Sequence, residues 1–277
     1  MLPWHFEAFR RFLTFDVIQQ ACAALLPFEG EALFEDPSLL SEFTTLLYKR
    51  TGMEWLPRRE VSDGINFNIE GSVFRNKARI FSSLYLVDPK SFDFKETLAI
   101  TNFGRAIGLG FVTEQEFYRQ ILMRYEYPHP AYEENWDAWI AAKCFLRPFI
   151  YFMDLMINIY EKDGEGSIAV EEIAQVAFKN PDHKLVKLYS EEILNLRTRK
   201  SLQKRTRDDQ VDRKIGDILG FMCLSGVTFY DGNKVGLNLI DKHKEEASFF
   251  WEKRKGQDRL SELKAIVASA TRELYEK

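Results

Sequence analysis

An amphipathic pattern is concentrated in Val73-Phe74-Arg75-Asn76-Lys77-Ala78-Arg79-Ile80-Phe81-Ser82-Ser83-Leu84. Its apolar residues recur at a spacing that places them on one face of a helix, and its basic and amide side chains fall on the opposite face near the helix start. The apolar face consists of Val73, Phe74, Ala78 and Phe81, and the polar face consists of Arg75, Asn76 and Arg79, with Lys77 at the border. The spacing therefore predicts an amphipathic helix that exposes a cationic face.

Two apolar segments after this helix predict a β-hairpin. Tyr85-Leu86-Val87 and Thr97-Leu98-Ala99-Ile100 have the composition of short strands, and Asp88-Pro89-Lys90 supplies a turn. A helix followed directly by a hairpin is the final part of a winged helix.

The residues before this segment supply the remaining helices of such a unit. Helical periodicity extends from about Phe6 to Leu26 and from Ser38 to Tyr48, the second stretch following the helix-start signal Asp36-Pro37. Ile65 to Ile69 alternates like a short strand. The order helix, helix, helix, hairpin predicts a winged-helix subdomain.

Two further helices complete the first part of the chain. One begins at Thr101, whose hydroxyl is expected to cap it, and the other begins with a capping box formed by Thr113 and Glu116. The second helix ends before Tyr127-Pro128-His129-Pro130, which we predict to mark a domain boundary.

A second helix-turn-helix arrangement is expected between this boundary and residue 200. The stretch Phe145 to Tyr160 is apolar almost all round and predicts a buried helix whose start is delayed by Pro148. Ser167 introduces a predicted helix over Ile168–Ala174, and Lys184 to Leu196 is amphipathic.

A third helix-plus-hairpin element follows. We predict a helix over Ile215–Leu224, a hairpin over Val227–Leu237 that turns at Asp231-Gly232, and a charged terminal helix from about Asp258 to Tyr275. The fold class is thus mainly α with small β-hairpins, arranged as tandem winged-helix or helix-turn-helix subdomains. The expected divisions are residues 1–130, 131–200 and 201–277.

The most biased segment of the chain is basic. Between Arg197 and Lys214 there are eight basic and three acidic residues, a local balance of +5, although the whole chain has a net charge of −4. Because the total charge would repel DNA, nucleic-acid binding requires a locally basic face. The alternative for each basic segment is a solvated surface without a partner.

Arg can bridge guanine O6 and N7, Asn can bridge adenine N6 and N7, and basic side chains contact phosphates. The candidate DNA-binding residues are Arg75, Asn76, Lys77, Arg79, Arg197, Arg199, Lys200, Lys204, Arg205 and Arg207.

Composition and residue spacing argue against several other classes of function. The three cysteines and four histidines are far apart, so neither a disulfide framework nor a metal site is expected. No apolar stretch is long enough to span a membrane, and the N-terminus lacks the pattern of a secretory signal, so we expect a cytoplasmic protein. Adjacent rather than convergent carboxylates give no acid–base site, and we predict no catalytic residue and no small-molecule cofactor.

Two segments resemble the DNA-recognition half of type IIS restriction endonucleases of the FokI and AlwI kind. The first is Ala99-Ile100-Thr101-Asn102-Phe103-Gly104-Arg105-Ala106. The second includes Glu116-Phe117-Tyr118-Arg119-Gln120-Ile121-Leu122 and Tyr125-Glu126-Tyr127-Pro128. The resemblance extends from about residue 60 to 245, and it departs from the family pattern at Met123-Arg124-Tyr125-Glu126, where the family prefers a Lys-Trp-Gln run.

The resemblance implies sequence-specific recognition of double-stranded DNA, in service of restriction and defence against phage. In that family a metal-dependent nuclease domain follows the recognition region, and Mg²⁺ would belong to that domain or to a partner subunit. The spacings Asp88-Pro89-Lys90 and Asp93-Phe94-Lys95 fall on the expected wing rather than on a buried nuclease strand. The alternatives are a winged-helix transcriptional or accessory regulator without a nuclease, and a protein-interaction scaffold.

Overall fold

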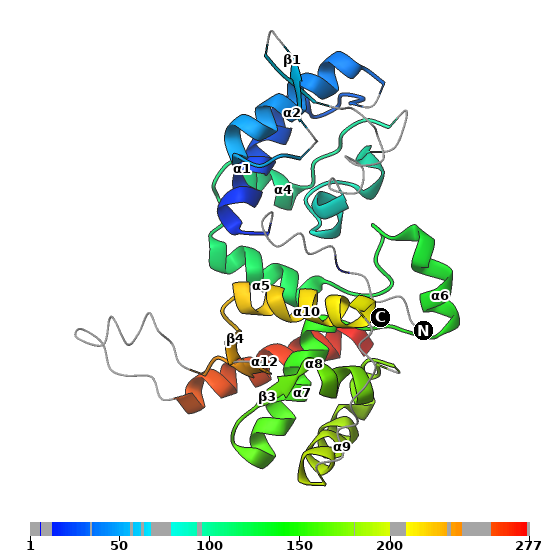
Figure 1. Cartoon of the computed structure of the whole chain (residues 1–277), viewed down its shortest axis with the longest axis vertical. Coiled ribbons are helices and arrows are strands. Elements are labelled where there is room, and N and C mark those ends of the chain that lie inside the picture. The colour runs from blue at the N-terminus through cyan, green and yellow to red at the C-terminus, as the bar shows by residue number, and fades with distance from the viewer. Residues whose placement is uncertain are drawn as a thin grey trace, which may run out of the picture. The chain divides into compact units, whose positions relative to one another are not determined.

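Helices predominate in the structure, a computed structural model in which antiparallel sheets of two and three strands accompany them (Figure 1). The mainly helical class with small β-hairpins is therefore confirmed. The chain forms two compact units: unit 1 comprises Met1–Phe6, Arg119–His129 and Glu134–Lys277, and unit 2 comprises Glu7–Tyr118 and Pro130–Glu133. The residues that the structure describes are 6, 13–33, 35–55, 58–61, 64–67, 79–92, 96–179, 181–199, 209–231, 234–239 and 256–275.

Unit 2 begins with two packed helices, α1 (Phe15–Leu25) and α2 (Pro37–Thr51), with the 3₁₀ turn η2 (Leu26–Phe28) after α1. The expected start signal of α2 is confirmed, because the Asp36 carboxylate accepts hydrogen bonds from the backbone N–H groups of Ser38 and Leu39. The buried face of α2 packs in the core, where the rings of Phe28 and Phe43 meet edge to face at 5.3 Å.

A hairpin follows α2 directly. Strands β1 (Arg58–Val61) and β2 (Gly64–Phe67) pair in antiparallel register, with Arg58 opposite Phe67 and Val61 opposite Gly64. The sequence predicted the second of these strands but not the first. This hairpin lies before the expected Val73–Leu84 helix, whereas the predicted wing lay after it.

The predicted wing itself is reduced to one antiparallel bridge between Val87 and Ile100, with the 3₁₀ turn η3 (Pro89–Phe92) between them. The reason is that Leu98 hydrogen-bonds elsewhere: its N–H donates to Glu31 O, and its carbonyl accepts from the N–H of Gly30. The predicted pairing of 85–87 with 97–100 is therefore confirmed only at Val87 and Ile100, where the N–H of Asp88 donates to Ala99 O and the N–H of Thr101 donates to Leu86 O.

The next helices of the chain confirm their predicted caps. In α4 (Asn102–Gly108) the Thr101 hydroxyl accepts the N–H of Gly104, and at the start of α5 (Glu114–Arg124) the Thr113 hydroxyl accepts the N–H of Glu116. The Glu116 carboxylate completes the capping box by accepting the N–H of Thr113.

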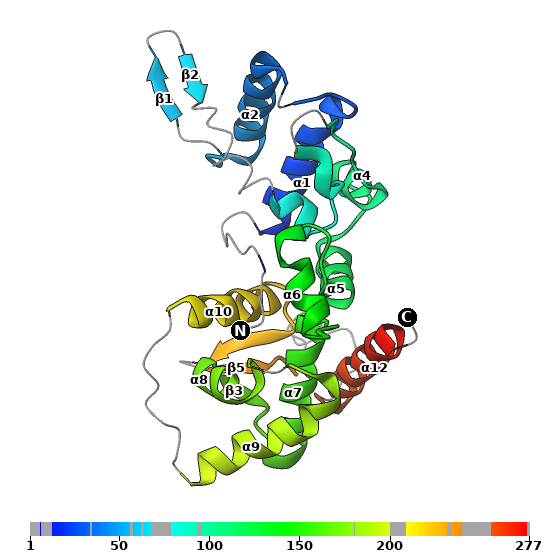
Figure 2. The same ribbon diagram turned by 90° about the vertical axis from the view of Figure 1, so that its right-hand side faces the viewer.

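Unit 1 is centred on α7 (Pro148–Asp163), which is buried almost all round and begins at the proline, as predicted. Helices α9 (Val186–Thr198), α10 (Asp209–Leu224) and α12 (Gly256–Tyr275) contact α7 (Figure 2). The smaller helical elements of the unit are η4 (Glu133–Asn135, which begins in unit 2), α6 (Trp136–Ala141), α8 (Val170–Glu172), the π-turn η5 (Ile173–Ala177) and η6 (His183–Leu185).

The three-stranded sheet of unit 1 has the order β3–β5–β4, all antiparallel. The hairpin of β4 (Thr228–Asp231) and β5 (Lys234–Leu237) confirms the predicted one, whereas β3 (Ser167–Ala169) occupies the start of a predicted helix. Because β3 pairs with β5, residues from both sides of the expected division at residue 200 belong to one compact unit.

Gly104 provides a test of the packing in unit 2. A Cβ atom at this position would lie 2.1 Å from the backbone carbonyl oxygen of Leu86, a neighbour that cannot rotate away. Gly104→Ala should therefore lower the free energy of unfolding by about 3 kcal/mol, measured by urea denaturation. Asn102→Ala, at an exposed position of the same helix, is the control, and an equal effect of both changes would contradict the packing argument.

His183 makes the stability of unit 1 dependent on pH. The imidazole is 7% exposed and lies edge to face against Tyr151 at 5.6 Å. Burial lowers the pKa of His183 to about 4, Asp182 opposes the shift, and Arg147 adds to it. The unfolded chain then binds more protons than the folded one between about pH 6.5 and 4.

Stability should accordingly fall as the pH is lowered through this window, by up to about 3 kcal/mol from His183 alone. In His183→Phe this part of the pH dependence should disappear, as measured by urea denaturation at pH 7, 5.5 and 4. Identical pH profiles of the variant and the unchanged protein would show that His183 does not cause it.

Candidate nucleic-acid interface

The structure describes three of the ten predicted DNA-binding residues. These are Arg79, Arg197 and Arg199. The others lie outside the described residues, so their assignment stays a prediction: Arg75, Asn76, Lys77, Lys200, Lys204, Arg205 and Arg207.

Arg79 lies at the start of the described part of the Val73–Leu84 segment and is half-buried. Its guanidinium carbon is 5.6 Å from the ring centroid of Tyr132, within the range of a cation–π contact. Ile80, Phe81 and Leu84, which follow it, are at most 1% exposed. These residues belong to the buried side of the segment, on which the sequence placed Phe81, whereas the predicted basic face lies, apart from Arg79, outside the described residues.

Arg197 forms an ionic network within unit 1. Its Nε lies 2.7 Å from Glu172 Oε1, its Nη2 lies 2.8 Å from Glu172 Oε2, and its Nη1 lies 2.8 Å from Asp163 Oδ2. Its Nη2 also donates to the carbonyl of Ser167. The hydrogen bond with Glu172 raises the pKa of Arg197. All three nitrogens of the guanidinium already have acceptors inside the protein.

The carboxylate of Glu172 needs an ionic partner, because Glu172 is only 1% exposed. Its Oε2 also accepts the N–H of Ala169, which joins β3 to the start of α8. A buried carboxylate is costly unless it is paired, so the contacts of Arg197 are a structural requirement of unit 1. Arg199, two residues later, is exposed beyond the end of α9 and is available to a phosphate.

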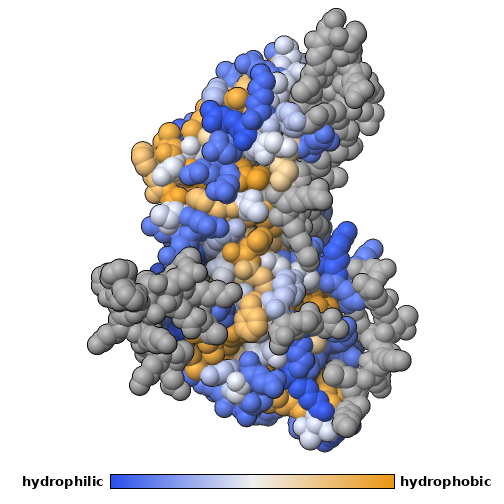
Figure 3. Space-filling view, turned by 60° about the vertical axis from the view of Figure 1, so that its left-hand side comes forward, coloured by the Kyte–Doolittle hydropathy of each residue, from blue (hydrophilic) through white to orange (hydrophobic). Residues whose placement is uncertain are grey.

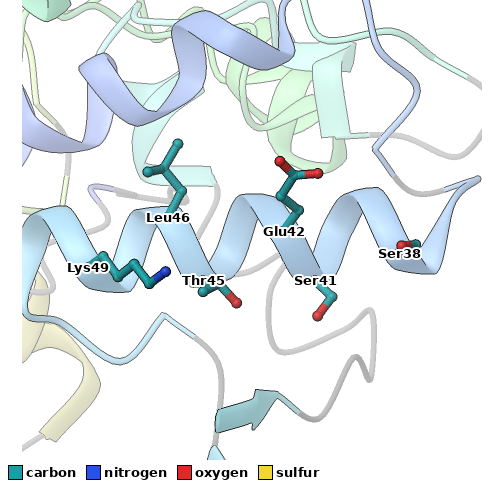
Figure 4. A pocket seen from close by; sticks show the side chains of 6 residues that line it. All are labelled: Ser38, Ser41, Glu42, Thr45, Leu46 and Lys49. Carbon is teal, nitrogen blue, oxygen red and sulfur yellow. The ribbon is translucent and has the colours of Figure 1, made fainter. Parts of the chain in front are cut away.

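A polar face that the sequence analysis did not single out lies on α2. A hollow runs along this face and is lined by Ser38, Ser41, Glu42, Thr45, Leu46 and Lys49 (Figure 4). The polar side chains are exposed or half-exposed, and within the described part of the chain they make no hydrogen bond or ion pair. The signal in the sequence was a serine and threonine repeat at helical spacing between 38 and 45.

Hydrophobic and hydrophilic side chains are interspersed on the face shown in Figure 3. Among the described residues, no helix is long and apolar enough to cross a membrane. The same residues contain no group of three or more His, Cys, Asp or Glu side chains that could hold a metal ion. The Asp88 carboxylate, which belongs to a predicted Asp-x-Lys spacing, accepts the backbone N–H of Lys90 in a turn.

The fold is that of a mainly helical protein with two small antiparallel sheets, and comparison with known proteins places it further. No protein-family model matches the chain, and no curated protein has a significantly similar sequence. A solved structure does match: the "Crystal structure of pyrene- and phenanthrene-modified DNA in complex with the BpuJ1 endonuclease binding domain". The TM-score is 0.62 at 12% sequence identity, and the match covers 89% of this chain and 82% of that chain.

At this level of identity the match establishes a shared fold. The chain therefore has the fold of an endonuclease binding domain, in agreement with the resemblance found in its sequence. The motif residues that suggested the resemblance have structural roles: Thr101 caps α4, Gly104 packs against Leu86, and Phe117 is buried. They identify the fold without identifying a contact to a ligand.

Alanine variants of Arg197 and Arg199 distinguish a residue that stabilises the fold from one that contacts DNA. Arg197→Ala leaves Glu172 buried without its ionic partner and should lower the free energy of unfolding by about 3 kcal/mol. Arg199→Ala should change it by less than about 0.5 kcal/mol because the side chain is exposed. Urea denaturation measures both.

The salt dependence of DNA binding gives the second measurement. A lost phosphate contact lowers the log–log salt slope by about one, which we expect for Arg199→Ala but not for Arg197→Ala. If Arg197→Ala left stability intact and lowered the slope, Arg197 would be a phosphate ligand rather than part of the ionic network.

Proposed function

We propose that this chain recognises double-stranded DNA in a sequence-specific manner, as the DNA-binding part of a type IIS-like restriction endonuclease. The observation that most supports this is the fold that it shares with the BpuJ1 endonuclease binding domain, whose crystal structure is a complex with DNA. The resemblance of Ala99–Ala106 and Glu116–Pro128 to the recognition half of the type IIS family points to the same function.

We further propose that each unit contains a winged helix. In unit 1 the chain runs through α7, β3, α8, α9, α10, β4 and β5, and the sheet order β3–β5–β4 places the second strand of the hairpin between the other two. In unit 2, α1 and α2 precede the hairpin of β1 and β2. Helix-turn-helix proteins place one recognition helix in the major groove, and this order supports such a mode of binding.

Cleavage is assigned to a nuclease domain or subunit that acts with this chain. Mg²⁺ would accordingly belong to that nuclease, where it would activate water and stabilise the leaving oxygen. In this role the protein would act in the cytoplasm, in a restriction-modification system that limits phage.

Selection of bound duplexes from a random-sequence pool tests the function. At about 0.1 M salt, where phosphate contacts still favour binding, we expect enrichment of one asymmetric site of several base pairs. The chain alone should leave this DNA uncut, with or without Mg²⁺. Sequencing of the bound and unbound fractions measures both properties.

Other outcomes would point to the competing functions. Enrichment of a palindrome bound by a homodimer would favour a regulator, because a two-fold symmetric protein reads a two-fold symmetric site. Binding to no duplex at low salt would favour a protein-interaction scaffold. For the predicted contacts, unchanged binding and preference in an Arg75→Ala, Arg79→Ala double variant would reject base recognition by these two residues.

A further inference from the structure

We infer that α2 is a base-reading helix of unit 2, and that its polar face enters the major groove of DNA. The face consists of Ser38, Ser41, Glu42, Thr45 and Lys49. This inference rests on the proposed function and deepens it, because it names the surface that determines sequence preference. It differs from the sequence-based prediction, which placed base reading on the Val73–Leu84 segment.

The position of α2 in the chain is the first argument. Strand β1 begins at Arg58, shortly after α2 ends at Thr51, and α2 contacts β2. Within unit 2, α2 is therefore the described helix that leads directly into a paired hairpin. In the winged-helix order the helix in this position is the one that reads DNA.

The two-sided character of α2 is the second argument. One side is anchored in the core through Leu40, Phe43 and Leu47, all at most 2% exposed. The opposite side has polar residues at a spacing of three or four, which forms a continuous stripe on a helix. From Ser38 to Lys49 this stripe is roughly 16 Å long at 1.5 Å per residue. The major groove is about 12 Å wide and admits an α-helix, so several side chains of the stripe could reach base edges together.

Within the described part of the chain, the polar side chains of this stripe make no hydrogen bond or ion pair, which is the third argument. Some charged side chains pair within the chain, as Lys162 does with Glu191 at 2.7 Å and Arg259 with Glu262 at 2.7 Å. In the described part of the chain, Glu42 and Lys49 have no such partner. The side chains shown in Figure 4 thus leave donors and acceptors along a hollow surface.

The described part of the 79–84 segment offers Arg79 as its candidate for base contact. Ile80, Phe81 and Leu84 are at most 1% exposed, and the guanidinium of Arg79 lies against Tyr132. Arg79 is thus already engaged within unit 2, and the other polar residues of that segment lie outside the described residues. In contrast, the helix start of α2 offers no anion site, because Asp36 already accepts its first N–H groups. Recognition by α2 therefore depends on its side chains.

The residue types predict what this face would read. The hydroxyls of Ser41 and Thr45 can donate to a base edge or accept from it. Glu42 can only accept, so it favours the N4 amino group of cytosine, and Lys49 can only donate, so it favours O6 and N7 of guanine. We therefore expect the recognised site to contain a C·G pair that Glu42 contacts.

Selection with variants of the full chain tests the inference. In Ser41→Ala, Thr45→Ala we expect about ten-fold weaker binding to the preferred site of the unchanged protein, with unchanged binding to unrelated duplex DNA. In Glu42→Gln the preference at one position should move from cytosine towards adenine, which glutamine binds through N6 and N7. Alanine and glutamine both favour helices, so both variants should stay folded, and urea denaturation verifies this.

The control is Gln115→Ala, Gln120→Ala, which removes two exposed polar side chains from α5. It should retain the preferred site and its affinity. If the unchanged protein selects a site and the α2 variants select it with equal affinity, α2 does not read bases and the inference is wrong. If the unchanged protein selects no site, the proposed function fails, and the inference fails with it.

Discussion

A single buried carboxylate determines much of the arrangement of unit 1. Glu172 is the last residue of α8, and its two oxygens accept from Arg197 and from the N–H of Ala169 at the end of β3. Through Asp163 and the carbonyl of Ser167, the same guanidinium also joins the end of α7 to the start of β3. Because one charged pair connects segments that are distant in sequence, α7, β3, α8 and α9 hold a common geometry.

The same contacts explain why a sequence-based assignment of DNA contacts is difficult. Arg197 is the first residue of the basic run, and composition alone makes it equivalent to Arg199. In the folded chain Arg197 is turned towards Glu172 and Asp163, whereas Arg199 is exposed. Local charge thus predicts that a basic surface exists, but the carboxylates of Glu172 and Asp163, the first of them buried, decide that Arg197 supports the fold.

Local signals in the sequence predicted the helices well. Asp36, Thr101 and Thr113 cap the helices that they were expected to cap, and Pro148 begins α7, because capping and proline geometry depend on nearby residues. The hairpin of β4 and β5 was also found. The reduction of the wing at 85–100 to a bridge was not predictable, since Leu98 pairs with Gly30 and Glu31 far away in the chain. Strand β3 was missed for a similar reason, because its partner β5 lies far along the chain.

The candidate site was less predictable than the fold. Positive charge was the property that predicted DNA contacts, and it pointed to Arg75, Arg79 and the 197–207 run. The face of α2 contains one lysine and one glutamate, so charge did not distinguish it. Its polar side chains have no internal partners among the described residues and lie on the helix that leads into a hairpin, a combination that only a folded structure reveals.

Arg147 has a consequence for the mechanics of the C-terminal helix. It is 3% exposed, and it donates both to the carbonyl of Ala270 and to the carboxylate of Glu273, while its other nitrogens hold Glu126. A slip of α12 by one residue would turn the helix by about 100° about its axis and remove both acceptors. Arg147 therefore fixes the rotation of α12 about its own axis. Because the same guanidinium also holds Glu126, a torque on the last turn of α12 is transmitted to the segment around Glu126.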